Sequence, residues 1–116
     1  MAESSRHFPD AMRRLVGEVE PRIEGMHGYL FEAPNGSQAV FWECSSEASV
    51  PPHKHDYDEY CVVVEGECEE YLEGRAVMLR KGDELHIPAG TVHWATIKPP
   101  YRSVDFFAGP RFRRAR

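Results

Sequence analysis

Short runs of aromatic and β-branched residues, separated by turn-forming residues, follow one another from Pro21 to Phe107. A spacing of about 8 to 12 residues between turns is typical of all-β sandwiches and barrels. The runs Tyr29–Phe31 and Ala39–Trp42 flank Asn35-Gly36, a dipeptide that strongly favours a hairpin turn. The sequence therefore predicts an all-β fold, and a small jelly-roll barrel is the economical way to leave few strand edges unpaired.

The other predicted strands end where glycine or proline occurs. We expect a loop over residues 45–52, a break at Gly66 between two strands, and a break at Pro99-Pro100 between the last two. Between these breaks the predicted strands span residues 59–64, 68–72, 75–79, 85–87, 92–97 and 103–107.

Both ends of the chain lie outside this β-rich region. Asp10 can cap a short helix over residues 11–16, which Gly17 would terminate. We therefore divide the chain into an N-terminal extension with a short helix (1–28), a β-barrel (29–110) and a basic C-terminal tail (111–116). We expect the tail to be solvated and partly disordered. The extension is long enough to pack on a neighbouring chain, so we predict a homodimer.

Composition limits the partners that the chain can have. A single domain fits 116 residues, and a net charge of −5 argues against nucleic acid as a partner. The sequence has no apolar run long enough to span a membrane, and its three cysteines have no CxxC spacing. We therefore expect a cytoplasmic protein whose partner is a small molecule, with neither a nucleic acid nor a membrane as a partner.

Three residues that can bind a metal, two histidines and a glutamate, lie close together after Pro51-Pro52, a dipeptide that favours extended backbone. In an extended strand His53 and His55 would point to the same side, and Glu59 could join them. A fourth donor, His93, follows a Pro-x-Gly turn. Histidines on strands are often structural, so a metal site requires that the two segments meet.

The two segments resemble the paired motifs of the cupin family. His53-x-His55-x3-Glu59 followed by Gly66 is similar to the first motif, and Gly82-x5-Pro88-x-Gly90-x2-His93 is similar to the second. Two positions differ from the family pattern, since Glu47 and Ile97 replace a glycine and an asparagine that often occur there.

This resemblance implies a double-stranded β-helix barrel in which His53, His55, Glu59 and His93 bind one divalent transition metal. Three imidazoles and a carboxylate suit Fe, Mn, Ni, Co or Zn, and the residues do not distinguish among these metals. Four protein ligands in an octahedron leave two positions for substrate, water or dioxygen. A tetrahedral zinc would instead be closed and structural.

A narrow pocket is expected beside the metal. Strand alternation places Cys61 and Val63 on the side of Glu59, and Ala95 and Ile97 on the side of His93. His86 is our candidate for a catalytic acid or base in this pocket.

Two functions fit these residues. The first is a metal-dependent enzyme acting on a small organic substrate, with a dioxygenase-like activity preferred to isomerase or lyase chemistry. The second is a non-catalytic ligand-binding or sensor cupin with a structural metal. Whether the chain is an enzyme does not follow from the sequence, because one fold hosts many functions.

Overall fold

The computed structural model describes residues 8–9, 18–20 and 23–114, and this part of the chain is all-β, as predicted. The predicted helix over residues 11–16 lies outside the described residues. In the described part, no helix has the length and apolar character needed to cross a bilayer. The strands are β1 (Val19–Glu20), β2 (His27–Glu32), β3 (Gln38–Cys44), β4 (Ala48–His53), β5 (Glu59–Leu72), β6 (Arg75–Arg80), β7 (Glu84–Ile87), β8 (His93–Phe107) and β9 (Arg113–Arg114).

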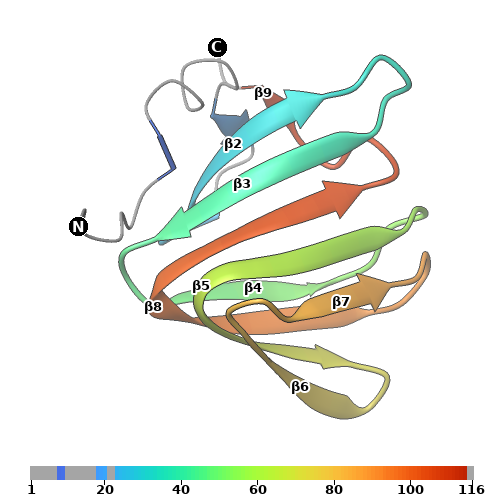
Figure 1. Cartoon of the computed structure of the whole chain (residues 1–116). Helices are drawn as coiled ribbons and strands as arrows, with labels where there is room; N and C mark the ends of the chain where they lie inside the picture. The colour runs from blue at the N-terminus through green and yellow to red at the C-terminus, as the bar shows by residue number, and fades with distance from the viewer. Residues whose placement is uncertain (1–7, 10–17, 21–22, 115–116) are drawn as a thin grey trace.

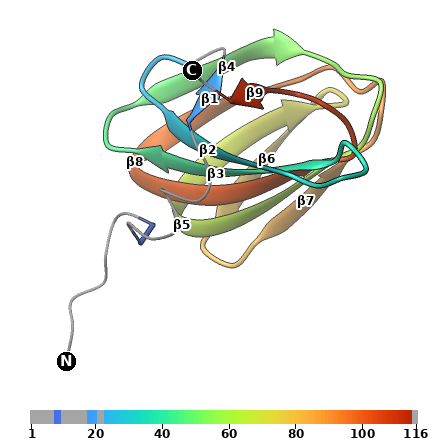
Figure 2. The ribbon, with the colours of Figure 1, turned by 90° about the horizontal axis from the view of Figure 1, so that it is seen from above.

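Two long antiparallel strands, β5 and β8, form the centre of the fold (Figure 1). The last part of β8 and the first part of β5 lie in one layer, where β3 pairs with β8, β2 pairs with β3, and β7 pairs with β5. The first part of β8 and the last part of β5 lie in the other layer, between β4 and β6. Figure 2 shows the two layers facing each other across the barrel interior, which is the jelly-roll arrangement expected from the sequence.

The predicted strand breaks at Gly66 and Pro99-Pro100 are wrong, because β5 and β8 continue through them. Glu65 pairs with Arg102 and Glu67 pairs with Lys98, so Gly66 lies opposite a longer piece of β8 in a bulge. A bulge interrupts the hydrogen-bond ladder locally, so proline is tolerated there. The two strands bend together at this point and pass from one layer to the other (Figure 1).

The loop predicted over residues 45–52 is also partly wrong, because β4 begins at Ala48 and pairs with β8. Pro51-Pro52 lies where the β4–β8 register shifts, between Val50 and His53. In the described part of the chain β4 pairs with β8 alone, and an edge strand tolerates proline because it has no ladder bond to donate on its free side.

The hydrophobic core fills the space between the layers and extends under both ends of the described chain. Leu30 and Val40 are fully buried, and Trp42 makes an edge-to-face contact with Phe112, with their ring centroids 5.4 Å apart. Phe112 is buried because the Gln38 side chain binds the backbone on both sides of it, donating to the Phe112 carbonyl at 2.7 Å and accepting from the Arg111 amide at 2.9 Å.

The prediction of a solvated tail is therefore wrong for Phe112, which is buried, whereas the side chains of Arg113 and Arg114 are exposed as expected. Arg113 and Arg114 pair with Glu20 and Val19, and this small sheet of β1 and β9 adjoins β2 (Figure 2). Val19 is 2% exposed, so the described part of the N-terminal extension packs on its own barrel.

Candidate metal centre

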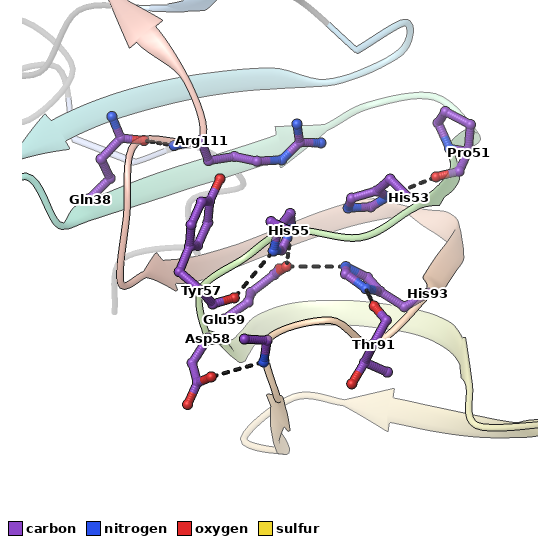
Figure 3. A network of polar contacts seen from close by, with 11 residues as sticks. Gln38, Pro51, His53, His55, Tyr57, Asp58, Glu59, Thr91, His93 and Arg111 are labelled. Atoms are coloured by element: carbon purple, nitrogen blue, oxygen red, sulfur yellow. Dashed lines mark hydrogen bonds and ion pairs between the residues drawn. The ribbon is translucent and has the colours of Figure 1, made fainter.

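The four predicted donor side chains meet at one point between the two layers (Figure 3). His53 ends β4, Glu59 begins β5 and His93 begins β8, while His55 lies in the loop that joins β4 to β5. His53 and His93 are paired across β4 and β8. One donor atom from each of the four side chains lies within 4.8 Å of the others. The sequence motifs thus converge as predicted.

Backbone carbonyls fix the orientation of the histidine rings. The Nδ1 atoms of His53 and His93 each lie 2.8 Å from a carbonyl oxygen, that of Pro51 and that of Thr91. His55 Nδ1 makes a longer contact of 3.5 Å with the Tyr57 carbonyl. A carbonyl can only accept a hydrogen bond, so each Nδ1 carries the hydrogen and each Nε2 keeps its lone pair. This tautomer presents Nε2 as a metal ligand.

Three donor atoms of the cluster are buried without a hydrogen-bond partner: His55 Nε2, His93 Nε2 and Glu59 Oε1. Glu59 Oε1 lies 3.4 Å from His55 Nε2 and 3.3 Å from His93 Nε2, which is longer than a well-made hydrogen bond, and in this tautomer neither nitrogen has a hydrogen to donate. Buried polar atoms without partners are costly and uncommon. A cation bound among these atoms would satisfy all three, so the residues fit a divalent metal.

The electrostatic environment keeps two of the imidazoles neutral. Burial lowers the pKa of both His53 and His55, although the neighbouring carbonyls oppose the shift. Burial also acts to lower the pKa of His93, but the Glu59 carboxylate and the Thr91 carbonyl outweigh it and leave that pKa raised. Neutral imidazoles bind metals and protonated ones do not. At a given pH a larger fraction of His93 than of His53 or His55 would be protonated, so a metal would compete with a proton mainly at His93.

A small cavity lies beside the cluster, inside the barrel. The cavity has a volume of about 40 Å³, which is room for a few water molecules. Cys61, Ala95 and Ile97 line it as predicted. A larger surface depression, of about 850 Å³, lies over Glu67, Met78 and Lys98 and is lined by none of the four donors.

Two further carboxyl groups, those of the buried Glu70 and the partly buried Asp105, line the same cavity. Burial and the nearby Glu59 raise the pKa of Glu70 to about 7. The same two causes raise the pKa of Asp105 well above its usual range, and its Oδ1 has no hydrogen-bond partner. Glu70 can therefore hold a proton near neutral pH, and the protonated form of Asp105 is favoured for the same reasons. Sequence reasoning missed them, although Asp105 alternates with Ser103 and Phe107, which are both buried.

Arg111 brings a positive charge to the mouth of the site. Its side chain extends toward the cluster in Figure 3, lines the cavity and stacks over the Phe112 ring with its guanidinium carbon 4.7 Å from the ring centroid. Its charge acts on His53, His55 and Tyr57. We had assigned this residue to a solvated tail, and its position depends on the Gln38 contact described above.

His86 does not enter the cavity, so its predicted role as an acid or base in the pocket is wrong. In β7 the neighbouring Ile87 takes the inward position and is 1% exposed, which turns His86 to the outer face. There its side chain is 53% exposed, and its Nε2 lies 3.0 Å from Asp58 Oδ2.

Comparison with known proteins places this geometry in context. The family model described as "Cupin domain" matches residues 40–98. An uncharacterized protein of Aquifex aeolicus is 38% identical over 85 residues, which are 72% of this chain and 68% of that protein.

Solved structures show the same fold. KdgF from Halomonas sp. is 28% identical, with a TM-score of 0.70 over 80% of this chain and 86% of that one. An RmlC-like cupin from Shewanella frigidimarina superposes over 96% of both chains with a TM-score of 0.74 and 22% identity. Bacillus subtilis oxalate decarboxylase, described with Mn(II) centres, matches 79% of this chain and 27% of its own at 16% identity and a TM-score of 0.66.

Proposed function

Because the chain belongs to the cupin domain family, we propose that it is a metal-dependent enzyme acting on a small organic acid. His53, His55, Glu59 and His93 would bind one divalent transition metal. The observation that carries the proposal is the set of three buried donor atoms, from His55, Glu59 and His93, that have no hydrogen-bond partner. Imidazole nitrogen and carboxylate oxygen suit Fe, Mn, Ni, Co or Zn. When bound, the metal would supply Lewis acidity toward a substrate oxygen.

The charges around the cavity indicate the substrate class. Arg111 presents its guanidinium at the mouth, where a carboxylate of the substrate would pair with it. The cavity itself has a volume of about 40 Å³, so a small molecule would fill it and extend toward Arg111. We therefore infer a small carboxylic acid as the substrate.

Glu70 and Asp105 favour proton-transfer chemistry. Both line the cavity, and both have a raised pKa because they are buried near Glu59. Glu70, with a pKa of about 7, is suited to donate or accept a proton during an isomerase or lyase reaction. This favours isomerase or lyase chemistry over the dioxygenase-like activity that we preferred from the sequence. Oxalate decarboxylase shows that the fold can host a Mn(II) enzyme.

A non-catalytic ligand-binding cupin is the second candidate, and the small volume of the cavity favours it. The coordination of the metal separates the two functions. We expect X-ray absorption of the metal-loaded protein to show five or six ligands, including exchangeable water. A closed four-coordinate zinc would support the non-catalytic alternative.

Two substitutions test the residues of the proposed site. We expect His55→Ala to abolish metal binding while the barrel stays folded, and full metal occupancy in this variant would refute the ligand assignment. We expect Arg111→Gln to weaken the binding of small carboxylic acids, measured as thermal shifts of the metal-loaded protein. Arg113→Gln is the matched control, because the Arg113 side chain is 78% exposed and pairs with Glu20. Equal effects of the two arginine variants would contradict a role for Arg111 in substrate binding.

A further inference from the structure

One carboxylate outside the cluster, Asp58, connects the two segments that carry the metal ligands (Figure 3). Its Oδ1 accepts a hydrogen bond of 2.9 Å from the Ala89 amide, and its Oδ2 lies 3.0 Å from His86 Nε2. The Asp58 carbonyl also accepts a bond of 2.9 Å from the Ala108 amide, just after β8. One residue therefore contacts the turn after β7, the end of β7 and the end of β8.

The turn that Asp58 binds leads directly to a metal ligand. Residues 88–90 form this turn, and the Gly90 amide donates a bond of 2.8 Å to the His55 carbonyl. The next residue, Thr91, supplies the carbonyl that orients the His93 ring. A shift of the turn would move that carbonyl and, with it, His93 Nε2 relative to the ligands His53 and His55.

We propose that Asp58 and His86 act as a positioning clamp, which sets the metal affinity of the site by holding the 88–90 turn against the segment that carries His53, His55 and Glu59. Neither residue is among the four ligands, and His86 lies on the outer face of the barrel. The clamp rests on the proposed metal centre. The simpler alternative is a surface turn contact that contributes to stability alone, so the test must separate metal affinity from stability.

Asp83 provides a matched control. It is also exposed, and its Oδ2 accepts a hydrogen bond of 2.8 Å from a backbone amide, that of Arg80, in the turn between β6 and β7. Asp83→Ala thus removes the same kind of contact as Asp58→Ala, but in a turn that carries no proposed ligand.

The experiment is a titration of the metal-free proteins with Co²⁺, followed by the visible absorption of the bound ion. Loss of a group that orients metal ligands typically weakens affinity by about 10- to 100-fold, so we expect at least about a tenfold loss for Asp58→Ala. His86→Ala keeps the Ala89 contact and should lose less. Asp58→Asn, whose amide oxygen can still accept from Ala89, should restore most of the affinity. Asp83→Ala should bind Co²⁺ like the wild type, while thermal unfolding shows comparable destabilisation of Asp58→Ala and Asp83→Ala.

The outcomes separate the clamp from the metal centre. A wild-type protein that fails to bind Co²⁺ would overturn the metal centre and the clamp together. A wild type that binds, with equal affinity in Asp58→Ala, would overturn the clamp alone, as would an equal loss of affinity in Asp83→Ala. If Asp58→Ala does not fold, two other variants replace it: His86→Ala, and Asp58→Ser, whose side chain is too short to reach both partners. Wild-type Co²⁺ affinity in both variants would refute the proposal.

Discussion

Gly66 occupies the bend that relates the two layers of the barrel, and replacing it with alanine should be strongly destabilising. Its φ is +83°, in the left-handed region. A Cβ added there would lie 2.2 Å from the Pro100 carbonyl oxygen and 3.1 Å from the Tyr101 Cα. Both neighbours are backbone atoms of β8, so the clash cannot be relieved by a change of side-chain rotamer.

The magnitude has two parts. Placing a non-glycine residue in the left-handed region costs about 1–2 kcal/mol. Relieving the contact with Pro100 requires the backbone of β8 to move, and strain of this kind in packed structures costs about 1–3 kcal/mol. We therefore expect Gly66→Ala to lose roughly 2–5 kcal/mol, a large part of the roughly 5–15 kcal/mol that stabilises a typical domain.

Gly74→Ala separates the two parts. Gly74 has a φ of +73° but nothing within 4 Å of its added Cβ, so this variant should show the conformational cost alone. Urea unfolding of the metal-free proteins, followed by tryptophan fluorescence, measures both variants, because Trp42 is 3% exposed in the core. Equal losses of unfolding free energy in the two variants would refute the argument from the close approach of Pro100.

Two further predictions concern the cavity and the histidines. In the metal-free protein, Glu70 has a pKa raised from 4.5 to about 7, so between these values the folded state binds more protons than the unfolded state and stability falls as pH rises. Glu70→Gln removes this pH dependence. The unfolding free energy of the variant minus that of the wild type should therefore rise by about 3 kcal/mol between pH 4 and pH 8. A difference that does not change with pH would contradict the raised pKa of Glu70. A Cβ at Gly109 would lie 2.4 Å from the Tyr57 ring, which stacks on the His55 ring with centroids 4.8 Å apart. Gly109→Ala should therefore displace the Tyr57 ring from His55 and weaken Co²⁺ binding. Gly74→Ala, which has nothing within 4 Å of its added Cβ, should not weaken it. Unchanged Co²⁺ affinity in Gly109→Ala would show that the Tyr57 stack does not support the ligand.

The clustering of the four donor residues was predictable because their spacing is a specific pattern, although the structural reason differs from the one expected. We placed His53 and His55 on one strand face, but β4 ends at His53. His55 reaches the cluster from the following loop, where its carbonyl accepts from the Gly90 amide. The motif therefore identified the four residues whose donor atoms cluster, while strand alternation explained only part of their geometry.

Other parts of the site depend on contacts that are distant in the sequence. The position of Arg111 depends on Gln38, which is 73 residues away and binds the Arg111 amide. The continuity of β5 and β8 depends on the matching of Gly66 with Pro99-Pro100, and each of these alone reads as a strand break. Such pairings are fixed by the tertiary fold and cannot be read from local propensity.

The bend at Gly66 also explains how two strands can supply two of the four proposed ligands together with both acids that line the cavity. Glu59 and Asp105 lie in one layer, on the first part of β5 and the last part of β8. His93 and Glu70 lie in the other layer, on the first part of β8 and the last part of β5. Each long strand therefore carries one proposed metal ligand and one further carboxyl group that lines the cavity, in opposite layers. Because the bend sets the spacing of the layers, Gly66→Ala should weaken Co²⁺ binding as well as stability, and unchanged affinity in a folded Gly66→Ala variant would show that the site does not depend on the bend.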